Sequence, residues 1–565
     1  MEADLVVRNC RLYVPYTMEF IECDVYVSGG RVLAVDCGEG YRIACREELN
    51  AGGRPVVPGF IDAHFHVDSS MLAPWTLARA LAARGTTCVV TDPHEVANVA
   101  GVEGVEWLME ACGSLPIRVY FQVPSCVPAS PFEDPGAELS LEDQLRLAER
   151  GCIALGEVMD YVGLVSGDPR LSRLVSEARH RGLVIEGHCP GLSGLGLDRY
   201  VYAGVDSDHT KLTSGNALEK ARKGVFLEVQ EKSLTEDVVD LLCRLPPGSY
   251  CLVTDDVLPD KLARDGHLDH LVRLAVKLGL PIEKALYAVT LAPAARMGLR
   301  DLGAVAPGKA ADLAVLEDLE SLRVRVVFCR GRLVYRRGGA PPVEAVSVPR
   351  RFLSTVHVAP LHEEDLAIRI GAKRGTAVVN VIGVEERSTL TRWLVREVPV
   401  RDGLLRWDET GLTLAAVVNR YGRGRRALGL LEGCRVEGGA AATTYAHDAH
   451  NLIIVGNSPR DMVAAAEKVA GMSGGVAVSV GGSIRCALPL PLMGIMSLDP
   501  LEKAAAAVAE IKEALRELGY RHTDPLKSLS TLTLTVAPEL RLSTWGLVDV
   551  KRRRVVPLVV KVSEE

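Results

Sequence analysis

The alternation of apolar and polar residues divides the chain into segments of different character. Residues 1–56 alternate along Val25-Tyr26-Val27 and Arg31-Val32-Leu33-Ala34-Val35, with Gly29-Gly30 between the two runs. A period of two with a glycine turn predicts short antiparallel strands. A similar pattern returns at 311–316 and 324–328. We therefore expect residues 1–56 and 301–345 to form one small β-sandwich domain together.

Residues 57–300 follow a different rhythm, in which short apolar runs alternate with helical stretches such as 141–149 and 270–278. This alternation predicts an α/β fold with a parallel sheet and right-handed crossovers. Eight units in about 240 residues match the length of a TIM-like (β/α)8 barrel. An open doubly wound sheet is the alternative, although no Gly-x-Gly-x-x-Gly turn follows the first strand. The predicted strands are 57–66, 86–92, 117–123, 153–159, 183–188, 204–209, 224–229 and 250–255.

The last segment, residues 346–565, combines apolar runs with one long helical pattern at 501–518. Gly-Gly pairs at 438–439, 474–475 and 481–482 indicate turns between strands. We expect a C-terminal α+β domain here.

Composition narrows the class of protein. The formal net charge of −7 argues against a broad nucleic-acid-binding surface. Fourteen cysteines without a Cys-x-x-Cys pair favour buried, reduced thiols in a cytoplasmic protein. The N-terminal residues include acids at positions 2 and 4 and no long apolar run, which predicts neither a signal peptide nor a membrane anchor. We expect a homo-oligomer that acts on a small molecule.

Ionisable residues follow most of the predicted barrel strands. The carboxyl ends of barrel strands meet at one mouth, where active sites of this fold lie. Residues two apart on a strand point the same way, so His64 and His66 can face one ion. Each ending alone is weak evidence, because a lone histidine at a strand end is more often structural. The endings are His64-Phe65-His66, Asp92-Pro93-His94-Glu95, Gly156-Glu157, Gly187-His188, Asp208-His209 and Thr254-Asp255-Asp256.

Together these residues predict a metal-dependent hydrolase. Imidazoles combined with two carboxylates suit two first-row divalent ions, Mn²⁺ or Fe²⁺, with Zn²⁺ possible. Glu157 could bridge the ions, and the pair would make hydroxide available near neutral pH. Asp255 would act as general base and then as general acid. Asp256 is the alternative, and we prefer Asp255 because it comes closer to the apolar run of its strand.

Longer motifs place the chain beside a known family. It resembles the amidohydrolase superfamily and, within it, the adenine deaminase family. The Asp-Pro-His-Glu and Pro-Ser-Cys-Val-Pro runs are the most specific, and the matches extend over nearly the whole chain. The motifs are Pro58-Gly59-Phe60-Ile61-Asp62-Ala63-His64-Phe65-His66, Thr91-Asp92-Pro93-His94-Glu95, Pro124-Ser125-Cys126-Val127-Pro128, Gly156-Glu157-Val158-Met159, Gly187-His188-Cys189-Pro190-Gly191, Ser207-Asp208-His209, Thr254-Asp255-Asp256 and His447-Asp448-Ala449-His450-Asn451.

The resemblance implies hydrolytic deamination of adenine to hypoxanthine and ammonia, a step of purine salvage. It also implies a binuclear metal centre. By motif position, one ion would be held by His64, His66, Glu157 and Asp255, and the other by Glu157, His188 and His209. A binuclear amidohydrolase for another aminopurine or a cyclic amide is one alternative. A non-enzymatic binding protein that kept the barrel is another.

Further residues are candidates for substrate chemistry. Glu95, and less so His94, is a candidate for a second proton transfer or for purine recognition, or else orients a metal-bound histidine. Ser125 and Cys126 are expected to line the purine pocket.

Two segments leave their roles open. His447, Asp448, His450 and Asn451 could reach the active site or a subunit interface, or form a turn. The run Val229-Gln230-Glu231-Lys232-Ser233 stands where the family usually has Arg-Glu-Gly-Ser, so the contacts there are expected to differ.

Overall fold

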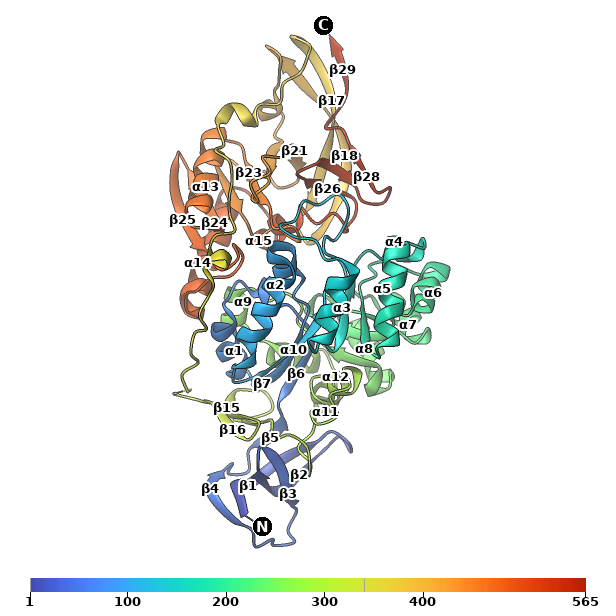
Figure 1. Cartoon of the computed structure of the whole chain (residues 1–565), viewed down its shortest axis with the longest axis vertical. Coiled ribbons are helices and arrows are strands. Elements are labelled where there is room, and N and C mark those ends of the chain that lie inside the picture. Colours follow the sequence, from blue (N-terminus) through green and yellow to red (C-terminus); the bar gives the residue numbers. More distant parts are fainter. Residues whose placement is uncertain (1, 340, 565) are drawn as a thin grey trace.

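Strands from both flanks of the parallel region pair in one eight-stranded sheet at the N-terminal end of the molecule (Figure 1). The computed structural model describes residues 2–339 and 341–564. The flanks meet where β5 runs antiparallel to β14, with Val57 opposite Ala314. The strands are β1 (Glu2–Val14), β2 (Glu19–Ser28), β3 (Arg31–Asp36), β4 (Ala44–Asn50), β5 (Pro55–Pro58), β14 (Leu313–Leu316), β15 (Val324–Cys329) and β16 (Arg332–Arg336).

This sheet differs from the prediction in the direction of some of its strands. Hydrogen bonds join its described strands into one connected sheet. The long strand β1 pairs with β4 along its first half and with β5 along its second half. Both pairings are parallel, so the prediction of antiparallel strands is wrong for β4 and for the pairing of β5 with β1. It is confirmed for β1–β2–β3, for β5–β14 and for β14–β15–β16.

The middle of the molecule contains parallel strands at the predicted positions. Five form one sheet in the order β10-β9-β8-β7-β6, and three form another in the order β11-β12-β13. The ends of the elements differ from the predicted ranges by a few residues, because the periodicity of a sequence does not fix where hydrogen bonding stops. The strands are β6 (Phe60–Phe65), β7 (Thr86–Thr91), β8 (Arg118–Val123), β9 (Ala154–Val158), β10 (Val184–Gly187), β11 (Ser207–Asp208), β12 (Phe226–Val229) and β13 (Tyr250–Leu252).

Helices between these strands cover the outside of the parallel sheets (Figure 1). The helical pattern at 141–149 is confirmed as α3, and the pattern at 270–278 falls in α10. The helices are α1 (Pro74–Ala82), α2 (His94–Gly113), α3 (Leu141–Glu149), α4 (Tyr161–Val165), α5 (Pro169–His180), α6 (Gly194–Ala203), α7 (Ser214–Arg222), α8 (Glu236–Arg244), α9 (Pro259–Arg264), α10 (Leu268–Lys277), α11 (Ile282–Tyr287) and α12 (Leu291–Arg296).

The first predicted strand, 57–66, is divided between two sheets. β5 belongs to the N-terminal sheet and β6 begins the parallel one, with Gly59 between them. The Gly59 amide donates to the Asp312 carbonyl at 2.9 Å. A Cβ atom at Gly59 would lie 2.1 Å from Thr87 Oγ1, so a larger residue does not fit here. The close approach of Thr87 on β7 therefore requires a glycine between β5 and β6.

The two parallel sheets approach each other at both pairs of edges. Beyond β13, the Asp255 amide donates to the His64 carbonyl at 3.1 Å, and Phe65 and Asp255 form a parallel β-bridge. At the other side, the Gly187 amide donates to Ser207 Oγ at 2.9 Å. The parallel strands thus form a curled arrangement, and their carboxyl ends lie close together.

The C-terminal segment is β-rich, with a ten-stranded sheet, a three-stranded sheet and three α-helices (Figure 1). The predicted helix at 501–518 is confirmed as α14. The elements are β17 (Arg374–Glu385), β18 (Ser388–Arg401), β19 (Leu404–Leu405), β20 (Thr413–Val418), β21 (Arg426–Glu432), β22 (Gly439–Thr443), β23 (Leu452–Gly456), α13 (Pro459–Gly471), β24 (Gly475–Val480), β25 (Ser483–Pro489), α14 (Leu501–Glu517), α15 (Pro525–Thr531), β26 (Leu540–Ser543), β27 (Gly546–Asp549), β28 (Arg554–Val556) and β29 (Val559–Glu564).

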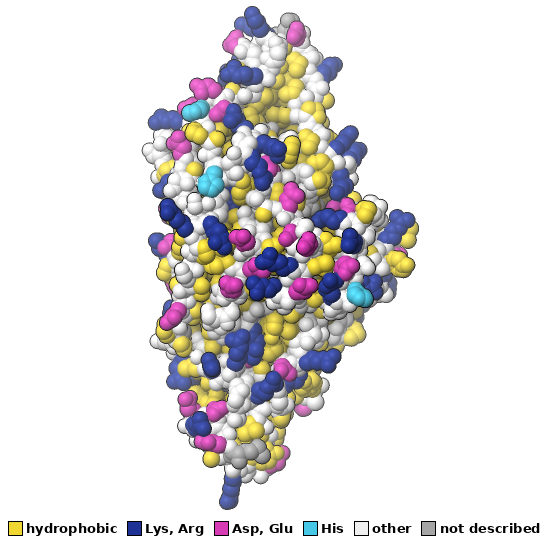
Figure 2. Space-filling view, in the orientation of Figure 1, with side chains coloured by type: hydrophobic (Ala, Val, Ile, Leu, Met, Phe, Trp, Pro, Cys, Tyr) yellow, Lys and Arg dark blue, Asp and Glu magenta, His cyan; other side chains and the backbone are white. Residues whose placement is uncertain are grey.

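Surface charge is mixed rather than segregated. On the face seen in Figure 2, Lys and Arg side chains are interspersed with Asp and Glu. Among the described residues, no helix is both long and apolar enough to cross a membrane.

Candidate metal centre

The six residues predicted as metal ligands converge at the carboxyl ends of the parallel strands. Five of them, at positions 64, 66, 157, 209 and 255, are buried. The side chain of His188 is the most accessible, at 24% exposed. Five of them stand inside or directly after a strand, and Asp255 follows the last residue of β13 by three positions. They come from the ends of β6 (His64 and His66), β9 (Glu157), β10 (His188), β11 (His209) and β13 (Asp255).

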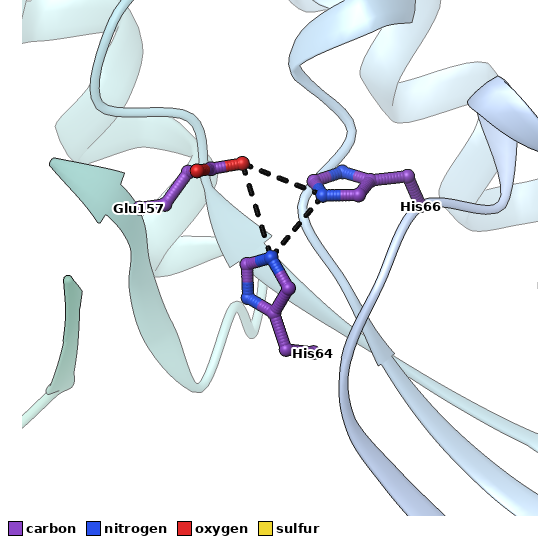
Figure 3. A group of neighbouring side chains, drawn as sticks. All are labelled: His64, His66 and Glu157. Atoms are coloured by element: carbon purple, nitrogen blue, oxygen red, sulfur yellow. Dashed lines mark hydrogen bonds and ion pairs between the residues drawn. The ribbon is translucent and has the colours of Figure 1, made fainter. Parts of the chain in front are cut away.

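One carboxylate oxygen of Glu157 faces the β6 histidines (Figure 3). Its Oε1 atom lies 3.4 Å from His66 Nε2 and 3.9 Å from His64 Nε2. The two Nε2 atoms are 3.3 Å apart. Asp255 Oδ1 completes this group, at 3.3 Å from His66 Nε2 and 3.9 Å from His64 Nε2.

The other oxygen of Glu157 faces a second pair of histidines. Its Oε2 atom lies 2.6 Å from His188 Nδ1 and 3.2 Å from His209 Nε2. These two ring nitrogens are 3.2 Å apart. Glu157 therefore stands between two sets of nitrogen and oxygen donors, with one oxygen turned to each.

The two adjacent aspartates after β13 have different partners. Asp255 faces the histidines, and its Oδ2 atom accepts a hydrogen bond from Gln230 Nε2 at 2.6 Å. Asp256 instead accepts a hydrogen bond from Ser69 Oγ and lies 3.3 Å from Lys527 Nζ. The geometry thus favours Asp255 over Asp256 as the residue that belongs to the histidine group.

A backbone contact orients His66. Its Nδ1 atom lies 2.9 Å from the Asp92 carbonyl oxygen. A carbonyl only accepts, so Nδ1 carries a proton, and Nε2 is the ring nitrogen that faces Glu157 and Asp255 and could ligate a metal ion. The Asp92 side chain accepts a hydrogen bond from the Glu157 backbone amide at 3.1 Å, so Asp92 helps to position both His66 and Glu157.

The charges in the site suit cation binding. Burial raises the pKa of Glu157, but His209 and His188 outweigh it and hold this pKa well below its ordinary value. Burial, reinforced by His209, holds the pKa of His64 well below 6.5, which keeps its imidazole neutral. Burial lowers the pKa of His66 and His209, but the carboxylates that face them outweigh it and raise both. A metal ion ligates the neutral form of an imidazole, so metal binding would displace protons from these two rings.

The C-terminal segment contributes two histidines beside Glu95. His447 Nδ1 contacts Glu95 Oε1, and His450 Nε2 contacts Glu95 Oε2. All three are buried. Burial raises the pKa of Glu95, but the two imidazoles hold it well below its ordinary value. The motif at 447–451 thus reaches the neighbourhood of the site, whereas Asn451 points away and donates to the Asp134 carbonyl at 3.0 Å.

His94 links this cluster to the centre. Its Nε2 atom lies 3.6 Å from Glu95 Oε1, and its Nδ1 atom lies 3.5 Å from Asp92 Oδ2 and 4.0 Å from Glu157 Oε1. Its ring stands edge-on to that of His66, at 4.8 Å between centroids.

Ser125 and Cys126 are both buried beside Glu157. Ser125 Oγ donates to the Glu157 carbonyl at 2.5 Å and lies 3.2 Å from Cys126 Sγ. Burial raises the pKa of the Cys126 thiol, which disfavours the thiolate that a nucleophile requires.

Some contacts could not be recognised from sequence. Tyr445 donates its hydroxyl to the Ser69 carbonyl at 2.8 Å, and Lys527 approaches Asp256 from α15. Neither residue stands in a strand-end motif, so no local pattern marks it. Gln230 lies in the run that departs from the usual family motif, and its side chain contacts Asp255.

Comparison with known proteins gives consistent matches. Residues 56–334 match the model of the amidohydrolase family, and residues 388–554 match that of the adenine deaminase C-terminal domain. The adenine deaminase 2 of Shouchella clausii is 39% identical, over 99% of both chains. The adenine deaminase of Clostridium perfringens is 36% identical, over 99% of this chain and 100% of its own. That of Nitratidesulfovibrio vulgaris is 37% identical, over 97% of this chain and 95% of its own.

Proposed function

Because this chain belongs to the adenine deaminase family of the amidohydrolases, we propose that it hydrolyses adenine to hypoxanthine and ammonia. Within the site, the position of Glu157 is the observation that supports this proposal most strongly. One of its oxygens faces His64 and His66, which Asp255 also faces, and the other faces His188 and His209. Such a shared carboxylate is what a binuclear hydrolase needs.

His64, His66, Glu157 and Asp255 would hold one divalent ion, and Glu157, His188 and His209 the other. The fit is supported by the donor atoms of the first group, which lie 3.3 to 3.9 Å apart. Donors about 2.0–2.2 Å from a common ion have separations of this size. Nitrogen and carboxylate donors suit Mn²⁺ or Fe²⁺, with Zn²⁺ as the alternative. When bound, the ions would supply Lewis acidity and lower the pKa of a water molecule.

Asp255 is the proposed general base and general acid. Its carboxylate would take a proton from the attacking water and pass it to the exocyclic amine, which leaves C6 as ammonia. Gln230 supports this role because it binds Oδ2 and so fixes the plane of the carboxylate. Water supplies the oxygen of hypoxanthine, so no further co-reactant is needed.

Glu95 is the proposed second proton-handling group. The two imidazoles that contact its oxygens keep it ionised and fixed, so that protons can be exchanged within the cluster and delivered toward a ring nitrogen of the purine. His94, which lies between Glu95 and Glu157, would border the purine together with Ser125 and Cys126. Cys126 would contribute shape rather than a nucleophile.

We also propose how the chain is divided into domains: a closed barrel in the middle, a small domain built from both of its flanks, and a C-terminal domain. We propose that the five-stranded and three-stranded parallel sheets are parts of one (β/α)8 barrel spanning residues 57–300. The bridge between Phe65 and Asp255 and the hydrogen bond between Gly187 and Ser207 support closure. Residues 1–56 with 301–345 would form the small β domain, and residues 346–565 the C-terminal domain.

Ammonia release tests the function directly. The Mn²⁺-loaded protein is incubated separately with adenine, adenosine, guanine and cytosine. We expect rapid release from adenine only. Release from guanine but not adenine would indicate the alternative of another aminopurine, and release from adenosine but not adenine would contradict recognition of the free base.

A further inference from the structure

A cavity of about 1120 Å³, away from the candidate metal centre, lies where three parts of the chain meet. Its walls come from α1, from α9 and α10, from the edge of the N-terminal sheet around β16, and from the start of α14. Contacts join α1 to β16 and α9 to α14, which lie on one flank of the molecule (Figure 1). We propose that this cavity binds a multiply phosphorylated small molecule of the nucleoside triphosphate class.

The lining of the cavity is strongly cationic. It contains seven arginines, against the three carboxylates of Asp265, Asp269 and Glu502. The chain as a whole carries a formal charge of −7, so this excess of positive charge is a local feature. A concave surface lined by one sign of charge concentrates ligands of the opposite sign. Arginine in particular matches phosphate oxygens in pairs of hydrogen bonds.

Several of these guanidinium groups lack acidic partners. Among the residues that the structure describes, the side chains of Arg79 and Arg336 form no hydrogen bond or ion pair. The Arg323 side chain donates only to Ser321 Oγ, at 3.3 Å. These three come from α1, from the edge of the sheet and from the loop before β15. They surround the cavity from different sides and remain available to an anion.

Two further arginines form a fixed part of the wall. Arg84 and Arg273 share the single carboxylate of Asp269, at 3.7 and 2.8 Å. Arg84 also donates to the Ala263 carbonyl at 2.9 Å, and Arg273 to the Asp265 carbonyl at 2.6 Å. Two cations held in place around one anion leave positive charge that is already oriented, which lowers the entropy lost on binding a ligand.

The cavity also offers surfaces for an aromatic base. Trp75 on α1 and Tyr335 on β16 both line it and are half-buried. Aromatic side chains and guanidinium groups stack on nucleobases. Pockets for organic ligands enclose about 300–1,000 Å³, so this space accommodates a nucleotide rather than phosphate alone. None of the proposed metal ligands lines it.

Isothermal titration calorimetry of the metal-loaded protein tests the proposal, with excess Mg²⁺ present so that the probes do not strip the metal ions. The probes are ATP, inorganic tripolyphosphate and adenosine. We expect saturable binding of ATP and tripolyphosphate, weakened by added salt, and none of adenosine at this cavity. Tighter binding of ATP than of tripolyphosphate would indicate that the ligand is a nucleotide. Equal binding of the two would indicate that the cavity recognises the polyphosphate chain alone.

Matched variants locate the binding. The double substitution Arg79→Ala with Arg336→Ala is expected to weaken ATP binding by at least about tenfold, since two charge-assisted contacts are lost. Arg222→Ala, which removes an exposed arginine from α7 outside the cavity, should leave it unchanged. Deaminase activity measured in parallel shows that the variants fold. No saturable binding of either phosphate probe, or unchanged affinity in the double variant, would overturn the proposal.

Discussion

Among single residues, the proposed chemistry depends on which atoms each carboxylate contacts. Asp255 and Asp256 are neighbours in sequence, yet Asp255 faces His66 and Asp256 faces Ser69 and Lys527. The sequence favours Asp255 only through its distance from an apolar run. The partners of Asp256 could not be predicted, because Lys527 comes from a helix far along the chain.

The pair of aspartates offers a matched test of the proton-transfer role. Asp255→Asn keeps an oxygen that can ligate but removes the base, so we expect bound metal to remain and turnover to fall by about 10²-fold or more. Asp256→Asn should lose much less activity. Metal analysis and ammonia release measure the two properties separately. Turnover of the Asp255 variant at the wild-type rate would show that another residue moves the proton.

A buried ion pair beneath the site predicts a dependence on pH. Burial raises the pKa of Asp208, but Lys220, at 2.7 Å, outweighs it and lowers the pKa to about 2. A lowered pKa stabilises the fold above the unfolded value near 3.8, by about 2 kcal/mol, and this contribution disappears as pH falls from 4 toward 2.

Replacement of Asp208 tests this contribution. Asp208→Asn leaves Lys220 buried and unpaired, which costs about 3–5 kcal/mol at neutral pH. In metal-free protein, the Tm difference from wild type should therefore be large at pH 7 and shrink by pH 3. Asp198→Asn, in the exposed pair with Lys223, is the control and should change little. A Tm difference that stays constant between pH 7 and pH 3 would contradict the lowered pKa of Asp208.

At the scale of elements, strand positions were predictable because burial on both faces leaves continuous apolar runs between helical patterns. The break at Gly59 was not, since it depends on the approach of Thr87 from the next strand. The parallel pairing of β4 with β1 also depends on contacts distant in sequence.

The junction between β10 and β11 gives a prediction at this scale. A Cβ atom at Gly187 would lie 2.0 Å from the Ser207 carbonyl oxygen. Gly187→Ala should therefore separate the strands, destabilise the protein by about 1–3 kcal/mol and displace His188. Gly215→Ala on α7, where nothing lies within 4 Å, is the matched control. Thermal unfolding and metal content measure both effects. Equal stability of the two variants would argue against close packing at this junction.

For the whole molecule, the C-terminal segment contacts residues beside the candidate metal centre. Its histidines at 447 and 450 reach Glu95 on α2, and Tyr445 reaches Ser69. The sequence left the 447–451 motif open between the active site, a subunit interface and a turn, because no local pattern states which distant residue a side chain meets.

Replacing either histidine tests how much its contact with Glu95 contributes to turnover. His447→Asn and His450→Gln should each lower turnover by about tenfold or more while both metal ions stay bound, because Glu95 loses a partner that keeps it fixed. His357→Asn, at an exposed position, should be unaffected. Loss of metal from either variant would instead place the cluster within the metal centre. Full activity in both would remove Glu95 and its partners from the mechanism.

The proposed function requires Glu157 to be shared by two metal ions in one centre that deaminates adenine. The most direct measurement is the rate of ammonia release from adenine as metal-free protein is titrated with Mn²⁺, for wild type and Glu157→Gln. Because Glu157 faces both groups of histidines, we predict that the wild-type rate rises until two ions are bound per chain and that the variant holds one or none with little activity. Full activity at a single ion, or two tightly held ions in the variant, would contradict the account.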